Sequence, residues 1–176
     1  MRFDGTSSLL THPDNNGTYL RDTTLADYRI AKFSDQPDWI NLRCELWPNC
    51  SVERHQLEVE QLLKADGVVV VADVGGSLVG FAEVSIRQDH VERTHAVPVP
   101  YLEGWFVQKK HRSMGIGRGL LAFVERWVVD RGFDEIASDA EIDNLRSIDL
   151  HSKSGFTEVG RTVHFVKRLI RDNGQR

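Results

Sequence analysis

Residues 101–127 read YLEGWFVQKKHRSMGIGRGLLAFVERW, and this stretch decides the fold. Its first part, Tyr101 to Val107, is rich in aromatic and β-branched side chains, which is typical of a strand. After Gly119 the apolar residues recur at helical spacing, so the period changes from strand to helix across Gly115. The stretch therefore predicts a strand, a glycine-rich turn and a helix, in that order.

The turn between this strand and helix combines glycines with positive charge. It reads RSMGIGRG over residues 112–119. Glycines let successive backbone N–H groups point into one concavity, and the N-terminus of a helix adds a partial positive charge. Arg112 and Arg118 would suit a diphosphate. A purely structural turn is the alternative, but the pattern favours a site for a phosphate-bearing cofactor.

Two other phosphate motifs are excluded by spacing. The turn lacks the Gly-Lys-Ser/Thr ending of a nucleotide P-loop. Leu120 stands where a dinucleotide-binding fingerprint has its third glycine. The pattern that remains is Arg-x-x-Gly-x-Gly directly after a strand.

Composition sets limits on the class of protein. A chain of 176 residues has the length of one domain and needs no disulfide or metal to fold. A net charge of −4 argues against a nucleic-acid or membrane-surface partner and favours a cationic one. Cys44 and Cys50 are too few for a disulfide framework and lack zinc spacing, and the N-terminus has no apolar signal segment. We expect a cytoplasmic protein without a metal.

The rest of the chain predicts a mixed α/β sheet. We expect a polar extension over 1–26, a folded domain over 27–170 and a tail over 171–176. The predicted helices run from about 34 to 47, from 51 to 65, from the glycine turn to 131, and from 143 to 154. The predicted strands cover 28–33, 68–73, 78–86, 101–107, 135–138, 157–159 and 163–166. The element order is therefore β-α-α-β-β-β-α-β-α-β-β, with about four helices.

This order and the glycine turn resemble the GNAT superfamily of acyl-CoA-dependent N-acyltransferases. Four further segments are similar to the aminoglycoside 6′-N-acetyltransferases of that superfamily. They are Leu42–Pro48, Ser85–Val91, Tyr101–Val107, and Ala137–Asn144 followed by His151 and Gly155-Phe156. The resemblance spans about Tyr28 to Lys167. It implies a homodimeric, antibiotic-modifying enzyme that uses acetyl-CoA as co-substrate and confers resistance.

The resemblance also implies roles for individual residues. Cofactor contacts would come from Trp105, Phe106 and Val107 along the pantetheine arm, from Arg112, Ser113, Met114, Gly115, Ile116, Gly117 and Arg118 around the pyrophosphate, and from Asn144. The aminoglycoside would meet Trp47, His90, Glu103 and Asp139. The sequence departs from the family twice. His90 replaces a tyrosine, and Gly160 stands where some relatives carry a glutamate.

The chemistry of amine acetylation supports an acidic acceptor site. An ammonium must lose its proton before it attacks a thioester, so Glu103 is the candidate base, directly or through water. Asp139 is the candidate second acid, and His151 or, as second choice, His164 the acid that protonates the leaving thiolate. Each has a structural alternative: an outward-facing glutamate, a loop or capping aspartate and a half-buried histidine. Trp47 could likewise be either core or a wall of the site.

Two other functions remain open from the sequence. The chain could acetylate another small amine, such as a polyamine, or a protein N-terminus. It could also be a non-catalytic acyl-CoA-binding domain that kept the glycine turn and lost the chemistry, as the changes at His90 and Gly160 would allow. The favoured prediction is direct acetyl transfer to the 6′-amine of an aminoglycoside, without an acyl-enzyme.

Overall fold

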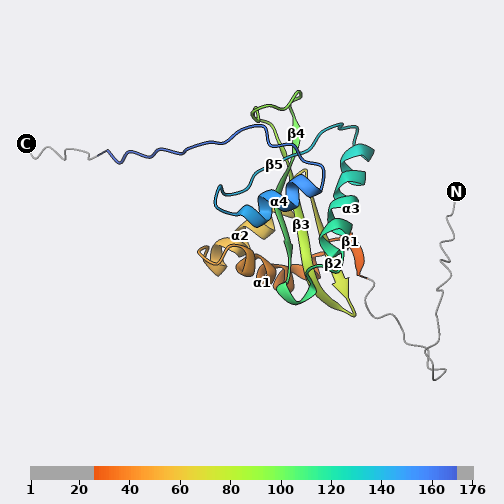
Figure 1. Cartoon of the computed structure of the whole chain (residues 1–176). Coiled ribbons are helices and arrows are strands. Elements are labelled where there is room, and N and C mark those ends of the chain that lie inside the picture. Colours follow the sequence, from red (N-terminus) through yellow and green to blue (C-terminus); the bar gives the residue numbers. More distant parts are fainter. Residues whose placement is uncertain (1–25, 170–176) are drawn as a thin grey trace, which may run out of the picture. The chain divides into compact units, whose positions relative to one another are not determined.

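A computed structural model describes residues 26–169 (Figure 1). The chain divides into two compact units. The first unit ends at Asp139 and the second begins at Ala140. The predicted extension, apart from its last residue, and the predicted tail lie outside the described residues. No helix among residues 26–169 is long and apolar enough to cross a membrane.

The first unit is built on a mixed sheet, as predicted, and the sheet has five strands. The strands lie side by side in chain order, and all neighbours are antiparallel except β4 and β5, which are parallel. Their bounds are β1 Asp27–Ile30, β2 Val68–Val74, β3 Ser77–Arg87, β4 Val99–Val107 and β5 Ala137–Ser138. The hairpin between β2 and β3 turns at two glycines with positive φ, as the doubled glycine predicts.

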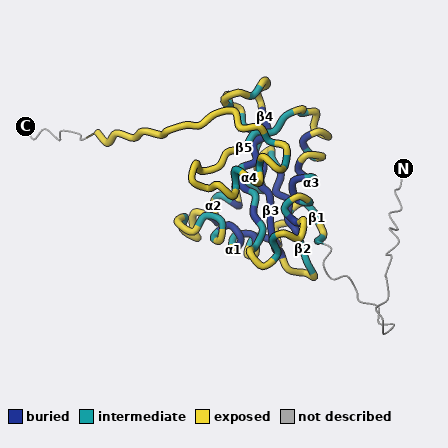
Figure 2. The backbone as a smooth tube through the Cα atoms, viewed as in Figure 1, coloured by how far each residue is buried: buried dark blue, intermediate teal, exposed yellow. Residues whose placement is uncertain are grey.

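Helices cover both faces of this sheet (Figure 1). Helices α1 (Gln36–Leu46) and α2 (Val52–Leu62) pack together, and α1 lies against β3. Helix α3 (Ile116–Asp130) packs on β2, β3 and β4 from the other face, through the predicted stripe Leu120, Leu121, Val124 and Val128. The buried part of the chain follows β2, β3 and the inner side of α3 (Figure 2).

Two of the strands are shorter than predicted. In both places a side-chain carboxylate accepts hydrogen bonds from backbone N–H groups next to the strand or in a neighbouring loop. The first strand stops at Ile30, and Phe33–Asp35 forms a 3₁₀ turn in which the Asp35 carboxylate accepts from the Lys32 N–H at 2.6 Å. The Arg29 guanidinium beside Asp35 lowers the pKa of that carboxyl. Near β5, the Glu135 carboxylate accepts two backbone N–H groups of the 88–98 loop, so the strand begins only at Ala137.

Strand β4 contains a β-bulge that the sequence did not predict. On β3, Glu83 pairs with Gly104 but the next residue, Val84, pairs with Leu102, so Glu103 is an extra residue in β4. Ser85 pairs with Tyr101. Because Glu83 and Ser85 are two residues apart on β3, their partners Gly104 and Tyr101 face the same way, although they are three apart. The bulge thus changes which side chains of β4 face α1 and α2.

Among its described residues, 140–169, the second unit contains one helix, α4 (Leu145–Lys153). Asn144 caps it by accepting from the Ser147 N–H at 3.1 Å, and Gly155 follows it with φ of 93°. The two strands predicted at 157–159 and 163–166 were wrong, since no residue from 156 to 169 is assigned to a strand. β-branched and aromatic residues favour a strand only when a partner strand satisfies the backbone, and the described structure gives this segment none.

Candidate active site

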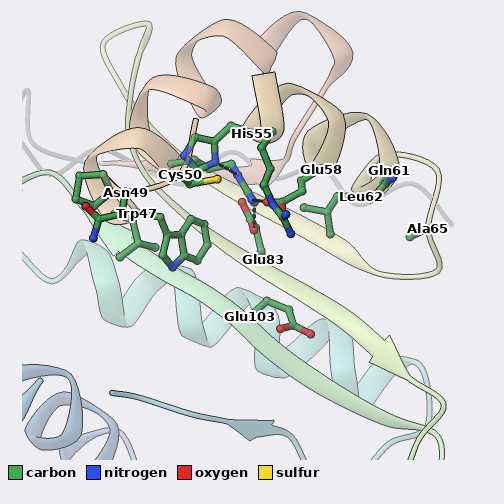
Figure 3. A pocket seen from close by; sticks show the side chains of 14 residues that line it. Trp47, Asn49, Cys50, His55, Glu58, Gln61, Leu62, Ala65, Glu83 and Glu103 are labelled. Atoms are coloured by element: carbon green, nitrogen blue, oxygen red, sulfur yellow. Dashed lines mark hydrogen bonds and ion pairs between the residues drawn. The ribbon is translucent and has the colours of Figure 1, made fainter. Parts of the chain in front are cut away.

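A cavity of about 810 Å³ opens between helices α1 and α2 and strands β3 and β4 (Figure 3). The C-terminal end of α1, the connection to α2 and one side of α2 form its walls. The lining side chains include Trp47, Asn49, Cys50, Arg54, His55, Glu58, Leu62, Glu83 and Glu103. The sequence predicted that two of these, Trp47 and Glu103, belong to one site, and the structure brings both to this cavity.

Trp47 forms a wall of the cavity and also packs on the core. Its ring lies 6.2 Å from the Phe81 ring and 4.7 Å from the Arg43 guanidinium carbon. The ring sits directly over Gly104, where an added Cβ would be only 2.6 Å from the tryptophan Cη2. Trp47 therefore packs on the core and lines the cavity, Gly104 provides the space for it, and its contact with an acceptor stays a prediction.

The floor of the cavity holds a buried ion network. Glu83 is 1% exposed, accepts from the Trp39 indole N–H at 2.7 Å and forms an ion pair with Arg43. Burial raises the pKa of the Glu83 carboxyl, while Arg43 and Trp39 act against that rise. Arg43 also donates to Glu58 at 2.5 Å and to the Nδ1 atom of His55 at 3.3 Å. Nothing in the sequence pattern pointed to this network, because the two partners in each of its hydrogen bonds lie 12 to 44 residues apart.

A second cluster surrounds the predicted base. The Glu103 carboxylate accepts two hydrogen bonds from Arg87, at 2.9 and 2.7 Å, and one from the Ser85 hydroxyl at 2.5 Å. The Arg87 guanidinium carbon lies 3.3 Å from the centroid of the Tyr101 ring. Glu103 is thus a partly buried carboxylate held by its neighbours, and the alternative of a freely outward-facing surface glutamate is excluded.

Asp139 belongs to the same cluster. Burial, and then Asp139 beside the phenol, raise the pKa of Tyr101 to about 12. Asp139 also contributes to the raised pKa of Arg87, after the larger contribution of Glu103. The bulge in β4 and the end of β5 therefore bring together the two acids that the sequence singled out, with one arginine and one tyrosine that it did not.

The glycine turn has the geometry of an anion site. Ser113 and Gly115 have φ of 66° and 80°, and α3 starts at Ile116 with no acidic residue in its first turn. The first N–H groups of a helix have no partner within it. The exposed side chains of Ser113, Met114 and Arg118 border this turn, and the half-buried Gly117 lies behind it.

Two predicted cofactor residues, Arg112 and Trp105, anchor this turn to β4. Arg112 donates to the Val107 carbonyl at 2.7 Å, and its guanidinium lies 5.5 Å from the Phe106 ring. The Trp105 indole N–H donates to the Gly117 carbonyl at 3.0 Å. The Phe106 side chain is 6% exposed and packs in the core, so it cannot line a cofactor groove through its ring.

One edge of β4 is open beside this turn. Within the first unit, β5 pairs with β4 only at Tyr101 and Leu102. From Glu103 to Val107 that edge of the strand has no neighbouring strand among residues 26–139. An extended ligand can hydrogen-bond to such an edge as an added strand would.

The remaining predicted site residues lie elsewhere. His90 is exposed in the loop after β3 and is not among the residues that line the cavity. In the second unit, the Nδ1–H group of His151 donates to the Ser147 carbonyl at 2.8 Å, and Asn144 caps α4. The exposed His164 lies in the extended segment after α4. The catalytic and cofactor roles of these residues stay predictions.

The cavity also contains the one group of possible metal ligands found in residues 26–169. The ligand atoms of Cys50, His55 and Glu58 lie within 4.8 Å of one another. Arg43 donates to both His55 and Glu58. A cation there would have to displace a buried arginine, so the donor set is a poor fit for a metal and we assign none.

Comparison with known proteins connects this geometry to a family. The model of the acetyltransferase (GNAT) family matches residues 33–156. The chain belongs to this family. The predicted fold class is thereby confirmed, and a GNAT acetyltransferase uses acetyl-CoA, which fits a glycine turn beside an open strand edge.

Several relatives share most of their length with this GNAT chain. An aminoglycoside N(6′)-acetyltransferase type 1 of Stenotrophomonas maltophilia is 40% identical over 78% of this chain and 90% of its own. The protein of the same name from Klebsiella aerogenes is 36% identical over 80% and 95%. Among solved structures, the aminoglycoside N-acetyltransferase AAC(6′)-Iy in complex with CoA has a TM-score of 0.77 at 35% identity, covering 82% of this chain and 96% of that one. The predicted resemblance is confirmed.

The contact between Trp47 and Gly104 generates a test of the cavity wall. We expect Gly104→Ala to lower the free energy of unfolding by about 1–3 kcal/mol, because the new methyl group overpacks the site. In a Trp47→Ala background the same change should cost little, since the ring is gone. Urea unfolding of the four proteins in this cycle measures the coupling. Equal losses in both backgrounds would show that the ring does not rest on Gly104.

Proposed function

We propose that the protein transfers the acetyl group of acetyl-CoA to the 6′-amine of aminoglycosides and so confers resistance to them. The observation that carries this proposal is the position of Glu103, which lines the cavity and lies where the open edge of β4 begins. The relatives at 35–40% identity are aminoglycoside N(6′)-acetyltransferases. One structural neighbour, AAC(6′)-Iy, is bound to a CoA analogue joined to acetylneamine.

In the proposed reaction the amine attacks the thioester directly. Glu103 takes a proton from the bound ammonium, directly or through a water, and the amine nitrogen then forms a bond to the acetyl carbonyl carbon. The carbon–sulfur bond breaks, the nitrogen loses its second proton as the amide forms, and the leaving CoA thiolate takes up one proton. Bringing the two reactants together in this geometry can supply about 7–11 kcal/mol, whereas one acid or base gives roughly 10² to 10⁴-fold in rate. Positioning is therefore the larger contribution.

The residues of the first unit fit acetyl-CoA. The diphosphate would lie at the N-terminus of α3, against the backbone of residues 113–118 and the Arg118 charge. The pantetheine arm would run along the open β4 edge, next to Trp105 and Val107 and the backbone of Phe106. A backbone N–H near Val107 would receive the developing oxyanion. We propose a cytoplasmic reaction, which is consistent with the free thiols of Cys44 and Cys50.

The acceptor class follows from charge and shape. Glu103, which lines the cavity, and the exposed Asp139 beside Arg87 and Tyr101 supply carboxylates that attract an ammonium. A charge pair with Glu103 in a partly enclosed cleft is worth several times more than one in bulk water. Trp47 offers a flat apolar wall against which a sugar ring can pack. We propose that Trp47, Glu103 and Asp139 contact the drug, and that His90 does so only from the exposed loop that follows β3. A protein N-terminus as acceptor is less favoured, since it would present one charge and no ring.

Thiol release from acetyl-CoA tests this function. With two aminoglycosides that differ only in an amine or a hydroxyl at the 6′ carbon, we expect release with the amine alone. Glu103→Gln should lower kcat roughly 10² to 10⁴-fold while CoA still binds. A non-catalytic acyl-CoA-binding domain would release no thiol with either compound. Thiol release with polyamines but with neither aminoglycoside would show that the acceptor is another amine.

We also propose that the protein forms a homodimer. The extended segment of the second unit carries Val163, Phe165, Val166 and Leu169, whose side chains are 72–92% exposed. Contiguous exposed apolar side chains of this kind mark interaction sites.

Light scattering tests the dimer. The chain has a mass of 20.0 kDa, so a dimer should have about twice that mass. Phe165→Asp should shift the species toward the monomer, because a carboxylate in an apolar contact is unfavourable. A wild-type protein of 20.0 kDa at micromolar concentration would contradict the proposal.

A further inference from the structure

The Glu103 carboxylate is fixed from two sides by residues of β3. Arg87 donates from Nε to Oε1 at 2.9 Å and from Nη2 to Oε2 at 2.7 Å. The Ser85 hydroxyl donates to Oε1 at 2.5 Å. Ser85 and Arg87 can reach Glu103 because they are two residues apart on β3, and so share a face, and because the bulge turns β4 toward that face.

These contacts leave one acceptor position on the Glu103 carboxylate for a further hydrogen-bond donor. A carboxylate has about four acceptor positions, two on each oxygen. Oε1 uses both of its positions, for Arg87 and Ser85, and Oε2 uses one for Arg87. Among the contacts of residues 26–169, the second position on Oε2 is therefore the one that an incoming N–H group can take.

Arg87 is itself held in place. Besides its two bonds to Glu103, its guanidinium lies on the Tyr101 ring, with Asp139 close enough to affect its pKa. A guanidinium held by a bidentate pair and an aromatic face is preorganised and does not readily move aside for a ligand. Together Glu103, Asp139 and Arg87 carry a net charge of −1, which matches a single ammonium.

We propose that Arg87, assisted by Ser85, is a positioning residue that aims Oε2 of Glu103 at the acceptor amine and limits the charge of this cluster to one. The proposal rests on the proposed function, because it assigns Arg87 a role in that reaction. Arg87 acts through Glu103 and does not itself contact the reacting atoms. Its loss should therefore affect turnover rather than acceptor binding.

Steady-state kinetics of Arg87→Gln and Arg131→Gln test this role. Arg131 is a matched control: it is 41% exposed against 40% for Arg87, pairs with Asp66, and lies 4.8 Å from the Trp127 ring centroid. We expect Arg87→Gln to lower kcat about 10 to 100-fold, since small misplacements of a catalytic group cost that much. KM for the aminoglycoside should stay the same or fall, because the cluster becomes more negative. Arg131→Gln should match the wild type.

Two further variants keep the test decisive. Arg87→Lys retains the charge but not the two parallel bonds, so its kcat should also stay below the wild-type value. Ser85→Ala removes one bond to Oε1 and should lower kcat by a smaller factor, even if Arg87→Gln does not fold. Wild-type kcat in the Arg87 variants, or a higher KM with unchanged kcat, would overturn the positioning role. A wild-type enzyme that releases no thiol would instead contradict the proposed function.

Discussion

The bulge at Glu103 is the constraint on which the site depends. It lets Tyr101 and Gly104 face the α1–α2 side of the sheet together, although a regular strand would turn them to opposite faces. The tyrosine supports Arg87, and the glycine leaves space for Trp47. The extra residue between them is the carboxylate that lines the cavity. One inserted residue thus assembles the acceptor cavity, immediately before the part of β4 whose edge is open.

Arginines control the charge of this cavity. The buried Glu83 and the half-buried Glu58 share Arg43, and Glu103 is paired with Arg87. Acids placed this close together would repel one another without such partners, and a buried unpaired carboxylate would be costly. The cavity therefore attracts a cation without holding an excess of buried negative charge. We regard Glu83 and Arg43 as the structural floor, and Glu103 with Asp139 as the part directed at the acceptor.

The sequence predicted what is determined locally. The start of the helix predicted from residue 51 and the strand, turn and helix around Gly115 agree with the structure, because each depends on residues within one turn. The bulge could not be predicted, since it exists only in the pairing of β4 with β3. The partner of Arg87 could not be predicted either, since Glu103 is 16 residues away and meets it only through the pairing of β3 with β4.

The errors have the same physical origin. Residues 157–159 and 163–166 have the composition of strands, but a strand also needs a neighbour, and composition does not supply one. Strand alternation likewise turns the Phe106 ring into the core, which leaves the backbone of Phe106 for the cofactor contact that the resemblance implies. In both cases the outcome depended on contacts distant in the sequence.

A crystal structure with CoA and an aminoglycoside bearing a 6′-amine would test the account most directly. The account predicts that the 6′ nitrogen lies about 2.6–3.2 Å from Oε2 of Glu103, or one water away. It also predicts that Arg87 still holds the carboxylate and that the pantetheine arm lies along the β4 edge from Trp105 to Val107. An acceptor amine bound away from Glu103, or an Arg87 displaced by the drug, would contradict it.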